Sequence, residues 1–407
     1  MVYEPDDIYA FKEKARFWAS SFSTVCIMDS NGYPDPYGSL SFRIAVGEKY
    51  RYQSSGKESI HKLQSFLDEH HENFIPGYFS YDQDTFFFLP ETVLTINCDA
   101  VEVEAKNPDE VIRAIETTQV EYQGASFKGK IQSRMSRDEY RDAFNSLKKH
   151  ILRGDIYEVN LCQEFYADDA QLNPLEAYIE LNAVSPTPFS CFFKHDEIAI
   201  MSASPERFLC RDKDLVISQP IKGTAPRGRT EAEDQNIIEK LKSSPKEQSE
   251  NIMIVDLVRN DLTISAELGT VKVEELLGLY SFKQVHQLIS TVSCRPKQSI
   301  VPTSIITNTF PPGSMTGAPK ISAMKLIEQY EASKRGIYSG SVGYFQGNRK
   351  FDFNVVIRSL IYDSKQQYLS FHVGGAVTAQ SHEEEEYNEC ILKASAIRQM
   401  LSKHKTT

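Results

Sequence analysis

The sequence predicts an α+β protein built on antiparallel β-sheets. Its predicted strands come in hairpin-like pairs and its predicted helices are grouped separately, which favours antiparallel sheets over alternating βαβ units. Hydrophobic residues make up 41% of the 407 residues, a share typical of globular proteins. A chain of this length can form a large core and one to three domains.

Aromatic runs at 79–81 and 86–89 are typical of strands, and Asn107-Pro108 marks the start of a helix. The polar stretch from Gln123 to Ser136 shows no period and contains glycine. We therefore predict a boundary there, between an N-terminal α+β region of residues 1–120 and a second domain of residues 125–407.

The next elements are predicted from periodicity and from their end signals. Asp138 to Ile151 is amphipathic and ends at Gly154, as expected of a helix. A strand is predicted over 156–165. Two further strands, 198–203 and 215–221, are predicted to form a hairpin with its turn at 211–214.

The second half of the chain has equally clear end signals. Ser244, Pro245 and Glu247 form a capping-box pattern that begins a helix reaching Arg259. The remaining predictions are a helix from Pro319 to Glu331, one alternating strand over 351–362, a strand over 368–373 that stops at Gly374-Gly375, and a last helix from His382 to Leu401.

Composition excludes several classes of protein. The net charge of −11 argues against wrapping nucleic acid or lying on an anionic membrane. No apolar run approaches the roughly 20 residues that span a bilayer, and the first residues lack the basic and apolar segments of a secretory signal. The seven cysteines are widely spaced without a CxxC pair, so we expect reduced thiols and a cytoplasmic protein.

Lys222 is a candidate nucleophile because it stands directly before Gly223-Thr224, at the end of an apolar strand. A lysine attacks only when neutral, which requires its pKa to fall by about 3 units from about 10.4. Taken alone, the position also fits a solvated surface lysine.

Three glutamates form a candidate metal site. Glu386 and Glu389 are three residues apart on the last predicted helix and share a face, and Glu250 lies in the second turn of another helix. Three converging carboxylates suit Mg²⁺. The alternative is a set of solvated charges that complement a helix dipole.

Three other patterns have both a functional and an ordinary interpretation. The stretch Gly313–Lys320 runs into a helix and fits either an anion site or a plain loop. Arg358 and Lys393 fit carboxylate binding or surface ion pairs. Glu206, at a strand end, fits a general acid or base or an exposed carboxylate.

In combination, these patterns resemble the chorismate-binding enzymes, which include anthranilate, aminodeoxychorismate, isochorismate and salicylate synthases. The resemblance covers about residues 135–401. The matching blocks are 154–161, 204–206, 220–224, 250–261, 313–320, 340–344, 357–359, 374–375 and 386–389.

The resemblance implies a sandwich of antiparallel sheets with helices outside and the active site in a cleft between two halves. It makes 125–407 the catalytic domain and the first 120 residues a regulatory or partner-contact part. Pro-Ile-Lys-Gly-Thr around Lys222 is the form of the aminodeoxychorismate-forming members, whereas anthranilate-forming members have alanine at this position. The implied reaction is amination of chorismate at C4, through attack of Lys222 at C2, toward p-aminobenzoate and folate.

The resemblance also implies roles for individual residues. Glu206 matches the general acid or base, and the three glutamates match the ligands of Mg²⁺. The matching substrate contacts are Arg358, Lys393, Gly374, Gly375, Thr224, Tyr344 and Gln287.

The sequence departs from the family pattern at a few positions. Gln287 replaces the usual histidine, with His286 one place earlier, and Ala376, Gln380 and Cys390 replace the usual glycine, aspartate and threonine. Glu158 stands where isochorismate and salicylate synthases have a water-activating lysine, which argues against water as the nucleophile.

Glutamine hydrolysis needs a nucleophilic cysteine, and no cysteine here lies in the Gly-x-Cys-x-Gly elbow of glutamine amidotransferases. We therefore expect free ammonia or, in a heterodimer, a separate glutaminase subunit as the nitrogen source. Two alternatives remain open: an anthranilate synthase component I, and a catalytically silent chorismate-binding subunit, for which Gln287 is the argument.

Overall fold

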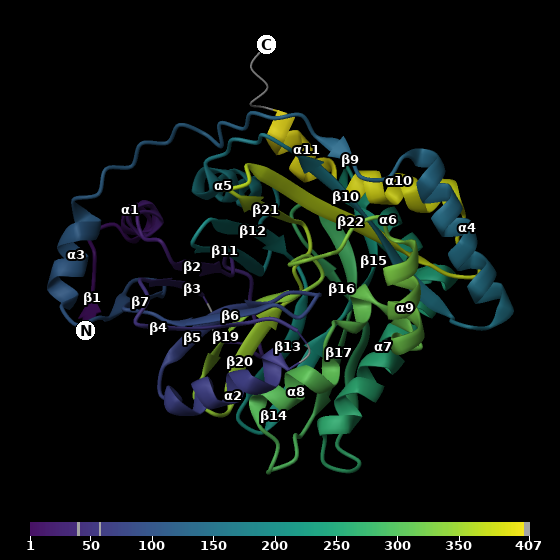
Figure 1. The fold of residues 1–407 in the computed structure, drawn as a ribbon, viewed down its shortest axis with the longest axis horizontal. Helices are drawn as coiled ribbons and strands as arrows, with labels where there is room; N and C mark the ends of the chain where they lie inside the picture. Colours follow the sequence, from purple (N-terminus) through teal and green to yellow (C-terminus); the bar gives the residue numbers. More distant parts are fainter. Residues whose placement is uncertain (39–40, 57, 403–407) are drawn as a thin grey trace.

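Two antiparallel β-sheets form the centre of the protein in the computed structural model, which describes residues 1–38, 41–56 and 58–402 (Figure 1). The last five residues of the predicted second domain lie outside the described residues. The larger sheet has the spatial order β1 (Val2–Tyr3), β8 (Val101–Glu104), β7 (Thr92–Ile96), β3 (Phe42–Val46), β2 (Val25–Asp29), β11 (Phe189–His195), β12 (Ile198–Ser204), β21 (Ser359–Asp363), β22 (Tyr368–Val377), β10 (Glu158–Ala167) and β18 (Gly317–Ala318), with β9 (Gln132–Ser133) beside β10.

The smaller sheet is built from strands of both the first 120 residues and the later chain. Its spatial order is β15 (Ile221–Pro226), β17 (Val285–Cys294), β14 (Leu215–Gln219), β13 (Arg207–Asp212), β20 (Lys350–Asn354), β19 (Ser341–Gln346), β5 (Phe74–Phe79), β6 (Thr85–Leu89) and β4 (Tyr50–Ser54), with β16 (Lys272–Ser281) paired to β17.

The two sheets pack face to face, as the sandwich prediction requires. Their shared core joins residues of β2, β3, β11 and β12 to residues of β5, β6 and β19, and it is rich in aromatic rings. Phe193 of the larger sheet contacts Phe86 and Phe88 of the smaller sheet edge-on, at ring-centroid distances of 6.0 and 5.9 Å. The α+β sandwich is therefore confirmed.

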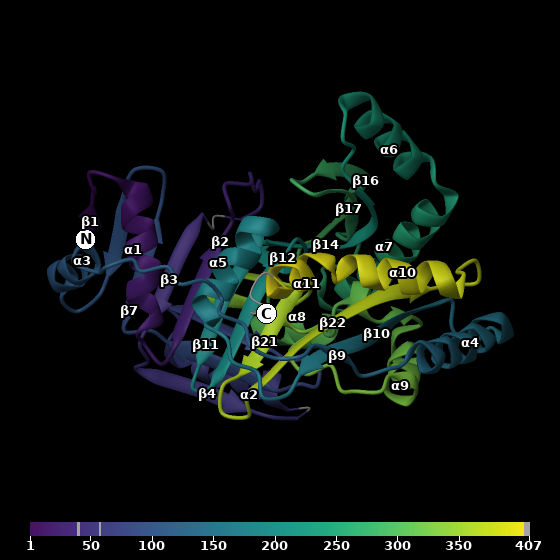
Figure 2. The same ribbon diagram turned by 90° about the horizontal axis from the view of Figure 1, so that it is seen from above.

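Helices cover the outer faces of both sheets. The larger sheet is covered by α1 (Ile8–Ser20), α3 (Pro108–Glu116), α5 (Pro174–Val184) and α11 (Ser395–Ser402). The smaller sheet is covered by α2 (Ser59–Glu69), α7 (Pro245–Ser265) and α8 (Pro302–Thr309). Three more helices lie where β10 begins and β22 ends: α4 (Arg137–Arg153), α9 (Lys320–Tyr330) and α10 (Glu383–Lys393). From above, α6 (Glu231–Ser243) projects beside β16 (Figure 2).

The predicted helix ends are confirmed where the capping residues are strong. Ser136 and Glu139 form a reciprocal capping box at the start of α4, and Gly154 ends the helix with a φ of 89°. The side chain of Ser244 accepts a hydrogen bond from the backbone N–H of Glu247, and Pro245 is the first residue of α7. The predicted last helix is divided in two at Ala394.

The hairpin predicted between 198–203 and 215–221 is wrong. β12 belongs to the larger sheet, where it pairs with β11 and β21. The hairpin partner of β14 is β13, and the turn between them contains Lys213 at a φ of 54°. Between β12 and β13 the chain passes from one sheet to the other, and Glu206 lies in this crossing.

The single strand predicted over 351–362 is also interrupted. β20 ends at Asn354 in the smaller sheet, and β21 begins at Ser359 in the larger sheet. Val355 faces the helix-covered core of the smaller sheet, whereas Val356 lies in the core between the sheets. Arg358 therefore lies in a second crossing rather than on a strand, with a φ of 52°.

Strands from both sides of the predicted 120/125 boundary share both sheets. β2 pairs with β11, and β5 pairs with β19. The division into two domains stays a prediction. None of the helices in the described part of the chain has the length and apolar character required to cross a membrane.

Candidate active site

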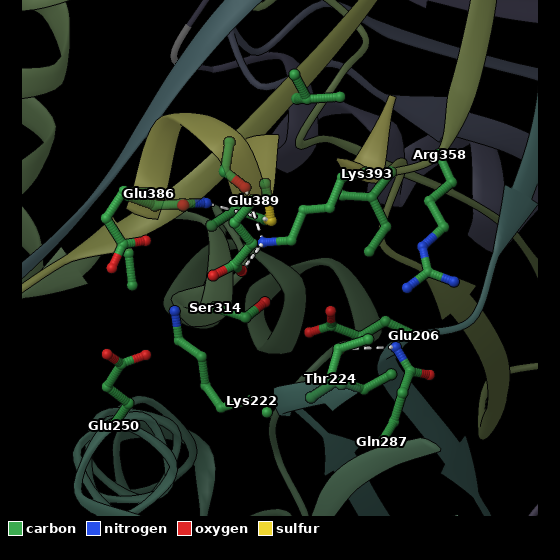
Figure 3. Close-up of a pocket in the computed structure, with 18 of the residues that line it drawn as sticks. Glu206, Lys222, Thr224, Glu250, Gln287, Ser314, Arg358, Glu386, Glu389 and Lys393 are labelled. Carbon is green, nitrogen blue, oxygen red and sulfur yellow. Dashed lines mark hydrogen bonds and ion pairs between the residues drawn. The ribbon is translucent and has the colours of Figure 1, made fainter. Parts of the chain in front are cut away.

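A cavity lies between the two sheets at one end, bounded by β10 and β22 of the larger sheet, β15 and β17 of the smaller sheet, and the helices α7 and α10. Its empty volume is about 940 Å³, including solvent at the mouth. Most of the predicted site residues line it (Figure 3). They are Lys222, Glu206, Arg358, Lys393, Gly374, Thr224, Gln287, Glu250, Glu386 and Glu389.

Lys222 projects into this cavity from β15. A bulge between Ile221 and Thr224 interrupts the pairing with β17, and Gly223 has a φ of 97°. The backbone carbonyl of Lys222 accepts a hydrogen bond from the side-chain amide of Asn251 on α7, at 3.1 Å. The irregular strand end is therefore fixed to a helix, which limits the positions that the lysine can take.

The ammonium group of Lys222 forms an ion pair with Glu158, with 2.8 Å between Nζ and Oε1. Burial lowers the pKa of Lys222, but the charges of Glu158 and Glu250 and the bond to Glu158 outweigh it, so the pKa is raised. This differs from the lowered pKa that nucleophilic attack requires. In the substrate-free protein Lys222 is an ammonium ion.

Glu206 lies in the crossing between β12 and β13 and is only 4% exposed. It accepts hydrogen bonds from the Ser314 hydroxyl and the backbone of Ile221, and Lys222 and Arg358 lie near enough to act on its charge. Burial raises the pKa of Glu206 to about 7. A carboxyl group with this pKa exchanges protons readily near neutral pH, as an acid–base catalyst must.

Arg358 faces Glu206 across the cavity (Figure 3). Burial lowers the pKa of its guanidinium to about 10, so it stays charged at pH 7. Its backbone carbonyl accepts a hydrogen bond from Ala203, which fixes the crossing to β12. For the guanidinium group itself, the described residues provide no hydrogen-bond partner, which leaves its fork available to a carboxylate.

Lys393 is already occupied in this structure. Its Nζ lies 2.7 Å from Glu389 Oε1 and donates a hydrogen bond of 3.0 Å to the backbone carbonyl of Gly374. A side chain at Gly374 would overlap the thiol of Cys162, so only glycine fits there. Gly375 is not among the residues that line the cavity, and a Cβ at this residue would lie 3.1 Å from Glu386 Oε2.

Gln287 and Thr224 form one side of the cavity. The amide of Gln287 donates to the Thr224 hydroxyl at 3.4 Å, and its own Oε1 is buried without a partner. His286 points away, and its ring lies between Asp234 and Ser281 at 2.9 and 2.8 Å.

Tyr344 does not reach the cavity. It is 1% exposed in the core between the sheets, where its ring lies 4.8 Å from that of Phe74 and the guanidinium of Arg43 lies over it. Tyr344 misses the cavity because its strand, β19, contributes none of the lining residues.

The acidic side chains at the candidate metal site come from two helices. Glu247 and Glu250 project from α7, and Glu386 and Glu389 from α10. Oε1 of Glu250 is buried without a partner, and burial raises the pKa of Glu250 to about 7, so a cation beside it would be stabilised. Glu386 instead pairs with Lys246 at 2.8 Å.

The donor set fits a hard, oxygen-binding cation such as Mg²⁺ in its chemistry. In the described ranges, however, no three acidic, histidine or cysteine side chains lie close enough to share one ion. Lysines neutralise two of the four carboxylates in this arrangement, at the Glu386 and Glu389 pairs.

Some lining residues were not predicted as site residues. Among them are Glu247, Asn160, Ser314, Met315, Tyr338 and His372. The spacing of Glu247 from Glu250 was a usable signal, because residues three apart share a helix face. The predicted anion loop contributes Ser314 and Met315, whereas Lys320 is directed away and binds Asp261 at 2.6 Å.

The chorismate binding enzyme family model matches residues 26–399. "Probable aminodeoxychorismate synthase, chloroplastic" of Oryza sativa subsp. japonica is 41% identical over 264 residues, 64% of this chain and 29% of that one. "Aminodeoxychorismate synthase component 1" of Escherichia coli (strain K12) is 38% identical over 272 residues, 67% of this chain and 59% of that one. "Anthranilate synthase component 1 2" of Haloarcula marismortui is 37% identical over 265 residues, 64% of this chain and 49% of that one. The chain spans less than two thirds of the length of these relatives.

Solved structures share the fold. The menaquinone-specific isochorismate synthase MenF of Escherichia coli has a TM-score of 0.80 at 18% identity, covering 98% of this chain and 93% of that one. Anthranilate synthase component I of Streptococcus pneumoniae has a TM-score of 0.77 at 21% identity, covering 91% and 93%.

Proposed function

The chain belongs to the chorismate-binding enzyme family, and on that premise we propose that it aminates chorismate at C4 to give 4-amino-4-deoxychorismate. The observation that carries this proposal is Lys222, which projects into the cavity at the position where anthranilate-forming members have alanine. Relatives named aminodeoxychorismate synthase support the same assignment.

The proposed reaction is two displacements at the ring. The neutral amine of Lys222 attacks C2, both ring double bonds shift, and the C4 hydroxyl departs as water with a proton from Glu206. Ammonia then attacks C4, the double bonds shift back, and Lys222 is expelled. Glu206, with a pKa of about 7, can give the first proton and accept one from the new ammonium group.

The cations of the cavity are proposed to hold the two substrate carboxylates. Arg358 has a free guanidinium fork for one of them. Lys393 already binds the anionic Oε1 of Glu389 and donates to the backbone carbonyl of Gly374, which supports a role for Lys393 in binding the other carboxylate. Bound Mg²⁺, which we propose as the cofactor, would neutralise a substrate carboxylate.

Glu250, Glu386 and Glu389 are the proposed ligands of Mg²⁺. Glu250 has an unpartnered buried oxygen, and Glu389 carries a pKa lowered by the charge of Lys393. Binding of the ion requires Lys246 to release Glu386. Glu386 and Glu389 would thus exchange their lysine partners for the metal ion.

Ammonia is proposed to come from a separate glutamine amidotransferase subunit, and the reaction to take place in the cytoplasm. The relatives named "component 1" support a partner protein. All seven cysteines are free thiols, and all but Cys98 are buried, which fits a reducing compartment.

Product analysis tests the proposal. The chain is mixed with chorismate, Mg²⁺ and ammonium, with and without an aminodeoxychorismate lyase. We expect p-aminobenzoate only when the lyase is present. Fluorescent anthranilate without the lyase would instead assign an anthranilate synthase, and no turnover under either condition would identify a silent chorismate-binding subunit.

A further inference from the structure

Glu158 is a buried acid whose position the proposed reaction does not yet explain. It is the first residue of β10 in the larger sheet and is 1% exposed; it is not among the residues that line the cavity, but it contacts Lys222, which is. Lys222 reaches it from β15 of the smaller sheet, and the 2.8 Å ion pair spans the two halves of the sandwich. The second oxygen, Oε2, is buried without a hydrogen-bond partner.

We propose that Glu158 is the positioning residue of Lys222, which holds its amine in the cavity, takes one of its protons before attack and returns that proton when the lysine is released. This inference rests on the proposed function, because it assigns the proton that Lys222 must lose. Of the acidic groups in the described chain, only Glu158 lies within hydrogen-bond distance of Nζ.

The proton transfer is balanced within the pair. One N–H bond of Lys222 breaks, its electron pair stays on nitrogen, and an O–H bond forms on Glu158. The pair is neutral overall before and after transfer, so no net charge is moved into a buried site. After ammonia displaces the lysine from C2, the carboxyl group returns its proton and the ion pair forms again.

Passing the proton from Lys222 to Glu158 avoids the larger free-energy cost of releasing it to solvent. Loss of the lysine proton to solvent would leave the negative charge of Glu158 buried beside a neutral amine, and breaking a buried pair in this way is costly.

Other charged groups around the cavity also interact electrostatically with Lys222. They are Glu247 and Glu250 on α7, Glu389 and Lys393 on α10, and Glu206.

The experiment measures covalent adduct formation in the full chain with chorismate and Mg²⁺ but without ammonia, by intact mass in single-turnover samples. Glu158→Gln keeps the size of the side chain but cannot accept a proton. We expect the adduct rate to fall about 100-fold or more at pH 7, with chorismate affinity nearly unchanged. Glu164→Gln, on the same strand but bound to Arg134 outside the cavity, is the matched control and should keep the wild-type rate.

The pH profile separates proton transfer from a purely structural role. In the variant the lysine must lose its proton to solvent, so the ratio of wild-type to variant rates should fall about tenfold per pH unit from pH 6 upward. A variant that forms adduct as fast as the wild type, or faster, would show that Glu158 is only a counter-ion and overturn the inference.

Wild-type protein alone also tests the idea, should Glu158→Gln fail to fold. Its adduct rate should not rise between pH 6 and pH 7, whereas a tenfold rise would place the lost proton in solvent and refute the role of Glu158. If the wild type gives neither adduct nor p-aminobenzoate, the proposed function fails as well. Normal turnover with an unchanged Glu158→Gln profile would refute only this inference.

Discussion

Glu206→Gln should make the protein more stable at alkaline pH while making it nearly inactive. Burial raises the pKa of Glu206 from its ordinary value of 4.5 to about 7, so ionising this carboxyl costs more in the folded than in the unfolded state. A raised pKa favours folding fully below pH 4.5, and that contribution is lost as the pH rises through 7. Glutamine does not ionise and avoids the loss.

The size of the effect follows from the shift. The difference between 4.5 and about 7 corresponds to about 3 kcal/mol in the free energy of unfolding at pH 8, and to almost nothing at pH 4. For a chain of this length we expect a rise of a few degrees in Tm at pH 8. Loss of the proton donor should lower the rate of C4 amination about 100- to 10,000-fold.

Thermal unfolding at pH 4, 6 and 8, followed by circular dichroism, together with the lyase-coupled assay, measures both effects. Glu164→Gln is the control with the opposite sign, since it removes one half of the ion pair with Arg134 and should lower Tm. A Tm difference between Glu206→Gln and wild type that does not change with pH would refute the buried-acid argument. Wild-type turnover in this variant would remove Glu206 from the mechanism.

Three further predictions concern the other groups of the cavity. Lys222→Ala should lose the covalent adduct and slow C4 amination by orders of magnitude yet still bind chorismate through Arg358 and Lys393; unchanged amination would exclude the covalent route. Glu389→Gln, or removal of Mg²⁺ by EDTA, should abolish turnover while the circular dichroism spectrum stays native, and full activity after EDTA treatment would contradict the metal assignment. Gln287→His should retain or raise activity in the coupled assay, because both side chains donate a hydrogen bond there; complete loss would show that the cavity is built differently.

Local chemistry predicted the helices well but the strand partners poorly. Ser136, Gly154 and Pro245 act within a few residues of themselves, so their effects can be read from sequence. Alternation over 351–362 marks extended chain but says nothing about its neighbours. The chain changes sheet within that run, because Val355 and Val356 face different cores.

The candidate site was likewise predicted only in part: the sequence indicated most of its residues but not the contacts between them. Family blocks indicated the residues that meet in the cavity, and most of them do. The ion pair between Glu158 and Lys222 joins residues of different sheets, and no periodicity relates them. Tyr344 lies in a matching block but packs in the core between the sheets on β19, which does not border the cavity, because a matching block does not by itself show where its strand lies relative to the site.

The interleaving of early and late strands sets an order of events during synthesis. Phe79 at the end of β5 pairs with Ser341 of β19, so β5 leaves the ribosome long before its neighbour exists. β2 likewise lacks β11 until the middle of the chain has been made. Such distant pairings slow folding and leave strand edges open to wrong partners. The nascent N-terminal strands therefore depend on protection from aggregation until the last quarter of the polypeptide emerges.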